Sequence, residues 1–362
     1  MLKRMAGMAA ALLAAILLFS VEVNAVSAEK AIVMDCDTGH VLYEKNADSR
    51  SLIASTTKIM TALIVCEQSN VLDRVRIPKA AVGIEGSSLY LKEGEILTVQ
   101  ELLYGLMLHS GNDAAVALAI YCGGTLNGFV QLMNDKATKL GMEQTHFQNP
   151  HGLDAPHHYA TARDLAILAS YAMKNPIFRQ TVSTKSTSIT NRTLRNHNKL
   201  LWRVSGVDGV KTGYTKAAGR ILVSSAYRNG RRIAVVTINA PSDWMDHEAL
   251  INGSFACYRE QQVVTKGDCL RYVDITGGET ECVSLIAADD LYCMVADWEE
   301  PQILLQEFGP IYAPVSEGEY AGIAYVQVGT AVIGKVSLLY GETIEQKTEN
   351  KVPFWKKLFG CD

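Results

Sequence analysis

The chain has 362 residues, of which 48% are hydrophobic and 20% charged, and its formal net charge is −4. This is the composition of a packed globular protein and excludes a disordered chain. The near-neutral balance, with no basic block, argues against a nucleic-acid-binding protein. The length predicts two domains.

The first residues have the pattern of a secretory signal peptide. Two basic residues precede an apolar run from Met5 to Val21, and both Ala25 and Ala28 end a small-x-Ala cleavage site. An uncleaved membrane anchor is the alternative, although the run is short for a spanning helix. We therefore expect residues 1–28 to be removed and the protein to act outside the cytoplasmic membrane, on its extracellular or periplasmic face.

Residues 29–258 have the pattern of an α+β domain. Strand patterns at Ala31–Met34 and Val41–Glu44 come first, and strand patterns return between Gly209 and Asn239, where Asn229-Gly230 predicts a tight hairpin. A helical cluster is thus expected to be inserted among the strands of one antiparallel sheet. The expected helices span Ser55–Glu67, Thr98–Leu108, Asp113–Cys122, Gly128–Leu140, a segment that opens at Thr161, and Trp244–Tyr258.

Residues 259–345 are expected to form a small all-β domain, because the helical period disappears and short apolar runs alternate with Gly, Asp and Pro. The eight cysteines fit two states. A chain of this length folds on its core alone, which favours small buried thiols. An exported protein can instead carry one or two disulfides, and Cys269, Cys282 and Cys293 are the candidates. No close Cys/His cluster has the spacing of a zinc site, so we expect neither a metal nor a cofactor.

Ser55 and Lys58 stand three residues apart at the start of an expected helix. At this spacing the two side chains share one face, so a neutral lysine amine can take the proton of the serine hydroxyl and make it a nucleophile. The spacing alone is common by chance, and Ser55 alone reads as a helix N-cap.

Two later motifs add polar groups to this pair. Ser110 and Asn112 lie at a break between two helices, where a hydroxyl and an amide can face a cleft. Lys211, Thr212 and Gly213 lie on an expected strand just before a hairpin, and the glycine lets a substrate backbone approach closely. Taken singly, the first motif is also compatible with a plain turn and the second with a solvated strand end.

In this order and spacing, the three motifs resemble the signature of the penicillin-recognising serine enzymes. Their flanks resemble the low-molecular-mass penicillin-binding proteins that are D-alanyl-D-alanine carboxypeptidases. The resemblance covers about residues 30–258 and implies a β-lactamase/transpeptidase-like fold, while the β domain and tail match more loosely. The segments that carry it are Ile53–Ala62, His109–Ala115, Asn149–Asp154, Thr161–Asp164 and Val207–Thr215.

The resemblance implies that Ser55 attacks the penultimate carbonyl of peptidoglycan stem peptides ending in D-Ala-D-Ala and forms an acyl-enzyme, which water releases. Lys58 is the expected base for acylation, and Ser110 is expected to relay the proton to the leaving amine. A base of this kind needs a pKa far below the ordinary lysine value, and both burial and the nearby cation Lys211 push the pKa in that direction.

The remaining site residues are assigned to substrate binding by the same resemblance. Asn112 is expected to hold the substrate amide, and Lys211 and Thr212 the terminal carboxylate. The backbone N–H groups of Ser55 and Tyr214 are expected to stabilise the oxyanion. The strand around Lys211 is expected to pair with the extended peptide.

β-Lactam antibiotics are the expected covalent inhibitors. No Glu-x-x-Leu-Asn run lies between Ser110 and Lys211, which predicts a long-lived acyl-enzyme with penicillin. The alternatives on the same fold are a D,D-endopeptidase, a transpeptidase and a slow β-lactamase. A wall-binding homologue without catalysis is a further alternative.

Residues 346–362 form a short tail. As a helix begun at Pro353, it is amphipathic, and family members often end in an amphipathic anchor at the membrane surface. Peripheral membrane contact is therefore expected, with a disordered tail as the alternative. The apolar residues on its one side are Phe354, Trp355, Leu358 and Phe359.

Three histidines in one expected loop are interpreted as structural residues. His151, His157 and His158 belong to an expected loop, and no carboxylate spacing supports a triad or a metal site there. The run Asn196-His197-Asn198, upstream of the Lys211 strand, is a candidate to frame the cleft.

Overall fold

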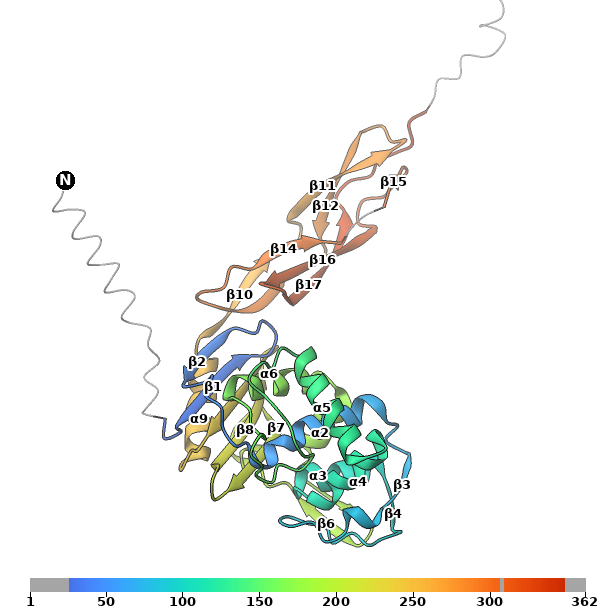
Figure 1. Cartoon of the computed structure of the whole chain (residues 1–362). Helices are drawn as coiled ribbons and strands as arrows, with labels where there is room; N and C mark the ends of the chain where they lie inside the picture. Colours follow the sequence, from blue (N-terminus) through green and yellow to red (C-terminus); the bar gives the residue numbers. More distant parts are fainter. Residues whose placement is uncertain (1–25, 307–308, 349–362) are drawn as a thin grey trace, which may run out of the picture. The chain divides into compact units, whose positions relative to one another are not determined.

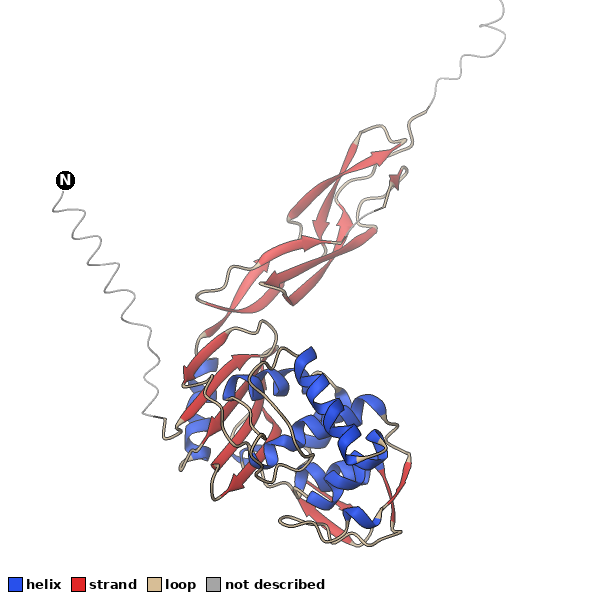
Figure 2. Ribbon diagram, viewed as in Figure 1, coloured by secondary structure: helices blue, strands red, loops and turns tan. Residues whose placement is uncertain are grey.

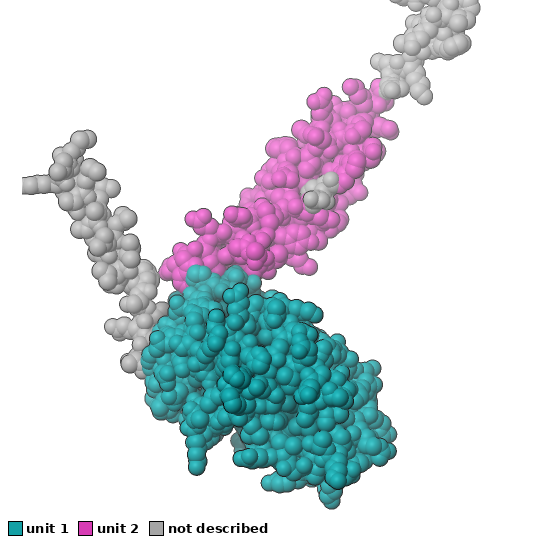
Figure 3. Space-filling model, in the orientation of Figure 1, with its two compact units in different colours: residues 1–257 teal, residues 258–362 magenta. Residues whose placement is uncertain are grey.

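The computed structural model describes residues 26–306 and 309–348. The chain divides into two compact units, Met1–Cys257 and Tyr258–Asp362 (Figure 3). Residues 1–25 of the expected signal peptide lie outside the described residues. So do the tail residues Phe354, Trp355, Leu358 and Phe359.

Unit 1 is built on a five-stranded antiparallel sheet in the order β2-β1-β9-β8-β7 (Figure 1). The turn between β8 and β9 has positive φ at both Asn229 and Gly230, as the hairpin prediction requires. The expected α+β class and the expected strands are confirmed. The strands are β1 (Lys30–Asp35), β2 (Val41–Lys45), β7 (Val207–Thr215), β8 (Gly219–Arg228) and β9 (Arg231–Ile238).

Most of the helices of unit 1 lie between β2 and β7 in the sequence. Thr98 and Glu101 form the expected capping box at the start of α3. No single helix among the described residues is long and apolar enough to cross a membrane; α4 and α5 have that length only as a pair, which is bent by 85°. The helices are η1 (Ala54–Thr57), α2 (Lys58–Gln68), η2 (Lys79–Ala81), α3 (Val99–Leu108), α4 (Asn112–Gly123), α5 (Leu126–Lys139), α6 (Ala162–Ala172), α7 (Pro176–Ser183), α8 (Leu200–Arg203) and α9 (Asp243–Phe255).

Both faces of the sheet are covered by helices (Figure 2). Successive side chains of a strand point to opposite faces. Thus Ile32 of β1 belongs to the large apolar core that contains α2 and α6, whereas Val33 belongs to a smaller core with Leu250 of α9. Two short hairpins, β3 (Arg74–Arg76) with β4 (Ile96–Thr98) and β5 (Ser186–Ile189) with β6 (Arg192–Arg195), complete the unit.

Unit 2 is all β, as expected. A six-stranded sheet in the order β14-β16-β17-β12-β11-β15 accompanies the pair β10-β13, and residues such as Leu285, Val295 and Val326 form the core. The strands are β10 (Tyr258–Val264), β11 (Cys269–Thr276), β12 (Cys282–Ala287), β13 (Leu291–Ala296), β14 (Gln302–Leu305), β15 (Ile311–Tyr312), β16 (Tyr320–Val328) and β17 (Ala331–Tyr340).

The cysteines favour the thiol state. Cys36 and Cys66 are buried, as expected for small core thiols, whereas Cys269 and Cys282 are exposed free thiols. The alternative of a disulfide between the last two is therefore not formed. The register explains this, because Cys282 lies opposite Asp274 in the β11–β12 pair, five residues away from Cys269.

Candidate active site

Ser55 and Lys58 lie within hydrogen-bond distance of each other. Ser55 stands in the short η1 turn, and Lys58 opens α2, where its side chain is fully buried. Lys58 Nζ lies 3.0 Å from Ser55 Oγ, 2.7 Å from Asn112 Oδ1 and 2.6 Å from the His151 carbonyl oxygen, so a neutral amine can donate to the last two and accept from the serine hydroxyl. These partners fix the amine against the serine hydroxyl.

The surroundings of Lys58 favour the neutral amine. Burial holds the pKa of Lys58 well below its ordinary value, and the positive charge of Lys211 lowers it further, while Asp113 opposes the shift. Lys211 is itself 1% exposed, and burial lowers its pKa to about 7. Burial is thus the larger cause and the neighbouring cation the second. A buried neutral amine one helical turn from a hydroxyl is suited to act as a base.

Ser110 and Asn112 lie at the α3–α4 break. Ser110 has a φ of +66° and lines the same cavity as Ser55. Asn112 is 4% exposed; its Oδ1 accepts from Lys58, and its Nδ2 donates to the Glu85 carbonyl oxygen at 2.5 Å. Both polar atoms of the Asn112 side chain are thus engaged within the protein. In this structure Asn112 holds Lys58.

The residue after Asn112 anchors the neighbouring loop. The Asp113 carboxylate accepts from the backbone N–H groups of Leu89 and Leu91, both at 3.1 Å, and from Ser88 Oγ at 2.7 Å. Asp113 is 1% exposed. It ties the start of α4 to the 88–91 loop and so holds the Ser110 turn in place.

The strand β7 passes directly beside the nucleophile. A Cβ atom on Gly213 would lie 3.3 Å from the Ser55 nitrogen and 3.3 Å from the Ile53 carbonyl oxygen, so a larger residue would require these atoms to shift by a few tenths of an ångström. Lys211 lies beneath this surface and donates to the Thr212 carbonyl oxygen at 3.0 Å. Tyr214, in contrast, is 65% exposed.

A cavity of about 410 Å³ opens over Ser55. Arg220 lines it and donates to both carboxylate oxygens of Asp243, at 2.8 and 3.0 Å. The cationic side chains that line the cavity thus include Arg220 and Lys199, whereas Lys211 is buried. Of the candidate run Asn196-His197-Asn198, His197 lines the cavity, whereas the two asparagines are buried. The lining residues are Ser55, Ser87, Ser110, His197, Lys199, Thr212, Gly213, Tyr214, Arg220, Ile221, Asp243 and Trp244.

The loop at residues 149–153 supports the nucleophile from the other side. Gly152 has a φ of +90°, and a Cβ atom there would meet the Ala54 carbonyl oxygen at 1.9 Å. Thr61 Oγ1 donates to the Pro150 carbonyl oxygen at 2.7 Å. Sequence reasoning left this loop without a catalytic part, yet the His151 carbonyl holds Lys58. The sequence signal that could have identified this loop is the run Asn149-Pro150-His151-Gly152, which belongs to one of the segments that carry the family resemblance.

His158 supports the η1 turn. It is fully buried, and its Nδ1 accepts from the Gln148 N–H at 3.0 Å, so Nε2 carries the proton. Nε2 lies 2.7 Å from Thr57 Oγ1, which donates to the Ala54 carbonyl oxygen at 2.9 Å. His158 therefore has the structural part expected of it, and it braces the turn that carries Ser55.

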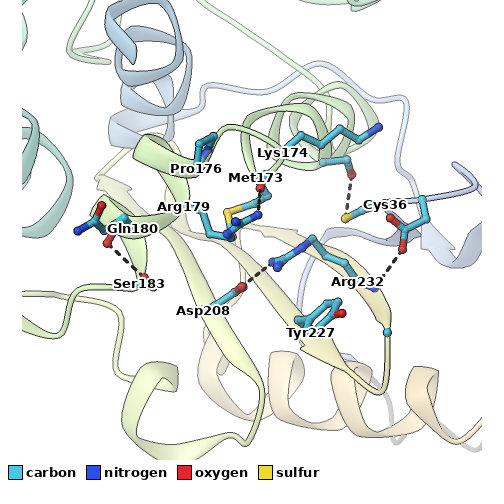
Figure 4. Close-up of a pocket in the computed structure, with 13 residues that line it drawn as sticks. Cys36, Met173, Lys174, Pro176, Arg179, Gln180, Ser183, Asp208, Tyr227 and Arg232 are labelled. Atoms are coloured by element: carbon cyan, nitrogen blue, oxygen red, sulfur yellow. Dashed lines mark hydrogen bonds and ion pairs between the residues drawn. The ribbon is translucent and has the colours of Figure 1, made fainter. Parts of the chain in front are cut away.

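A larger cavity, of about 780 Å³, lies elsewhere in unit 1 (Figure 4). Cys36, Arg179, Asp208 and Arg232 are among its lining residues, and Arg232 pairs with Asp208 at 2.6 Å. Burial raises the pKa of the Cys36 thiol to about 12, so this sulfur is no nucleophile. Cys36 therefore does not make this cavity a candidate site for acyl transfer.

Comparisons with known proteins agree with this geometry. Residues 18–242 match the family model described as D-alanyl-D-alanine carboxypeptidase. Residues 258–346 match the model described as the C-terminal domain of penicillin-binding protein 5.

Similar proteins cover most of the chain. D-alanyl-D-alanine carboxypeptidase DacF of Bacillus subtilis is 30% identical over 92% of this chain and 89% of its own length. DacC of Escherichia coli is 34% identical over 90% and 86%.

Solved structures give the same picture. Penicillin-binding protein 5 of Haemophilus influenzae is 27% identical, with a TM-score of 0.65 over 89% of this chain and 98% of that one. The Streptomyces K15 DD-transpeptidase is 39% identical, with a TM-score of 0.61 over 64% and 98%. The chain therefore belongs to the D-alanyl-D-alanine carboxypeptidase family of penicillin-binding serine hydrolases.

Proposed function

We propose that this enzyme removes the terminal D-alanine from peptidoglycan pentapeptides through an acyl-enzyme on Ser55. The observation that carries the proposal is the 3.0 Å contact between Ser55 Oγ and the amine of the buried Lys58, beside a cavity that Ser55 lines.

Acylation begins when Ser55 Oγ attacks the penultimate carbonyl carbon and its proton passes to the neutral Lys58 amine. The tetrahedral oxyanion is stabilised by the backbone N–H groups of Ser55 and Tyr214, the residue after Gly213. When the carbon–nitrogen bond breaks, Ser110 relays the proton from Lys58 to the departing D-alanine nitrogen. Lys58 is then neutral again, and the peptide is an ester on Ser55.

Substrate binding uses the strand β7 and the cations of the cavity. The extended peptide pairs with β7, the outermost strand of the sheet. Thr212 and Arg220 lie in the cavity and bind the terminal carboxylate, while the buried Lys211 contributes its charge from below. Asn112 acts mainly through Lys58, which its side chain contacts.

Deacylation uses a water molecule and the same base. Asp243 is the one carboxylate among the described residues that line the cavity, and Arg220 occupies both of its oxygens. No carboxylate base is thus available to activate a water on a bulky penicilloyl ester. β-Lactams are therefore expected to form a long-lived adduct.

The test has two readouts. Mass spectrometry of the intact protein after penicillin treatment should show one adduct that maps to Ser55, and a pentapeptide ending in D-Ala-D-Ala should lose one D-alanine. Ser55→Ala should abolish both, and Ser183→Ala, at the half-buried end of α7 and outside the Ser55 cavity, should leave both unchanged. Unchanged pentapeptide with intact Ser55 would instead identify a non-catalytic wall-binding homologue.

Transpeptidation is the second candidate. The Streptomyces K15 relative, 39% identical over the catalytic unit, is named both a D-alanyl-D-alanine carboxypeptidase and a DD-transpeptidase. Adding an amine acceptor to the pentapeptide assay separates the reactions, because a transpeptidase forms a new amide with the acceptor. Conversion of cross-linked dimers into monomeric peptides would show endopeptidase action, and rapid penicillin turnover would show a β-lactamase.

Export and membrane contact complete the proposal. The signal-peptide pattern of the first residues supports export, and the apolar tail residues Phe354, Trp355, Leu358 and Phe359 support peripheral contact with the membrane. Cell fractionation of the chain with and without residues 346–362 tests both, because loss of the tail should move the exported enzyme from the membrane fraction to the soluble one.

A further inference from the structure

Residues Val26–Ala28, here called the N-terminal segment, precede β1 and pack into unit 1. Val26 is 6% exposed and Ala28 is fully buried, and both belong to the apolar core beneath α9 together with Leu250 and Ile251. The segment is thus a part of the folded catalytic unit.

The polar groups of the N-terminal segment meet a carboxylate on α9. Asp246 Oδ1 accepts from the Ser27 N–H at 3.0 Å. Asp246 Oδ2 accepts from Ser27 Oγ at 2.6 Å and from the Ala28 N–H at 3.1 Å. Asp246 is only 7% exposed, so this carboxylate depends on the segment for its donors.

Two further groups depend on the same segment. Ser27 Oγ accepts from the Ser242 N–H at 3.0 Å, next to the start of α9. The Lys45 amine, at the end of β2, donates to the Val26 carbonyl oxygen at 3.1 Å and to the Ala28 carbonyl oxygen at 2.7 Å. The segment therefore ties β2 to α9 through six hydrogen bonds.

We infer that the export peptidase cleaves this chain after Ala25, so that the mature enzyme begins at Val26. The inference rests on the proposed export. The sequence offers two cleavage sites, after Ala25 and after Ala28. The removal of residues 1–28 expected from the sequence corresponds to the second site. Cleavage after Ala28 would remove all six hydrogen bonds and leave the Asp246 carboxylate nearly buried without the donors described above, which is costly.

Cleavage after Ala25 also adds a favourable charge. It creates an α-ammonium group on Val26, one residue from Ser27, whose N–H and hydroxyl both contact Asp246. A cation near a carboxylate at low exposure is stabilising. In the folded unit Ala28 is fully buried, so docking of the N-terminal segment conceals the second site after Ala28.

The experiment reads the N-terminus of the exported protein. The full chain is expressed in a bacterium that exports it, and the exported enzyme is analysed by intact mass and N-terminal sequencing. A first residue of Val26 is the expected result. A first residue of Glu29 overturns the inference while leaving export intact, and retention of residues 1–25 overturns processing altogether. Penicillin labelling of the same sample reports the proposed enzyme function separately.

A stability measurement tests the physical basis. Chains beginning at Val26 and at Glu29 are compared by thermal unfolding, and loss of the segment should lower the Tm by about 4 °C or more. Asp246→Asn should lower the Tm of the longer chain more than that of the shorter one, because only the longer chain has the donors. Equal Tm values for the two chains, or equal effects of Asp246→Asn, would refute the docking that underlies the inference.

Discussion

Gly213 of β7 lies so close to Ser55 that a Cβ atom on it would be 3.3 Å from the Ser55 nitrogen, one of the two proposed oxyanion donors. The strand that binds the substrate and the turn that carries the nucleophile are thus in direct backbone contact. A side chain at position 213 would require the strand or the turn to shift by a few tenths of an ångström.

Gly213→Ala should therefore slow acylation. Loss of one oxyanion donor typically lowers the rate by about 10²- to 10³-fold, and we expect the second-order rate with fluorescent penicillin to fall by about 10²-fold. Gly309→Ala is the matched control, because a Cβ atom there meets no atom within 4 Å. A Gly213→Ala enzyme that acylates at the wild-type rate would show that this approach is not needed.

Lys211→Gln should move the pH profile of acylation. The Lys211 charge lowers the pKa of Lys58, so its removal stabilises the protonated amine and raises that pKa. Less Lys58 is then neutral at a given pH, and the ascending limb of the penicillin acylation rate should shift to higher pH. Burial, the larger cause, remains, so the limb should stay below the ordinary lysine range. A limb that stays in place would remove Lys211 from this role.

Arg220→Gln should weaken substrate binding more than chemistry. A hydrogen bond to a charged group contributes about 1.5–3 kcal/mol, so we expect KM for the pentapeptide to rise about tenfold or more while kcat changes little. Arg259→Gln, which breaks the exposed pair with Asp297 in unit 2, is the control and should change neither constant. A lower kcat at unchanged KM would contradict the proposed role of Arg220 in binding the substrate carboxylate.

His158→Leu should destabilise unit 1 and slow acylation. The change leaves the Gln148 N–H without its acceptor and Thr57 without its histidine partner. An unsatisfied buried group costs about 1–3 kcal/mol, so urea unfolding should show a loss of about 2–5 kcal/mol. A variant with wild-type stability but slow acylation would instead assign His158 to positioning alone.

Acid should destabilise the protein through its buried histidines. Burial lowers the pKa of His158 to about 4 and that of His247 to about 3. Below the ordinary histidine pKa of about 6.5, the unfolded chain gains protons that the folded chain cannot take up until pH 4 and below. The free energy of unfolding should thus fall between pH 6.5 and 4, by about 3 kcal/mol for His158 alone. Urea titrations across this range test the slope, which His247→Gln should reduce.

Local features of the fold were readable from the sequence. The hairpin at Asn229-Gly230 and the capping box of Thr98 and Glu101 each depend on residues that are neighbours along the chain, so their chemistry is visible without the fold. The pair Ser55 and Lys58 is equally local, since one helical turn joins them.

Long-range contacts were not readable. The His151 carbonyl that accepts from Lys58 is 93 residues away in sequence, and a backbone oxygen leaves no mark on residue type. Asn112 could be placed near the site, but only the folded chain shows that Lys58 and the Glu85 carbonyl occupy its side chain. The sequence left the states of Cys269 and Cys282 open for the same reason, because strand register is a property of the sheet.

The sheet of unit 1 joins the two ends of the catalytic chain. β1 pairs only with its hairpin partner β2 and with β9, so that Lys30 lies opposite Ile238, about two hundred residues further on. Pairings between such distant segments form slowly, because the closure of a long loop precedes any stabilising contact. A nascent chain therefore lacks a finished sheet until nearly all of this unit has been synthesised, and the sheet closes only after the helices between β2 and β7 have left the ribosome.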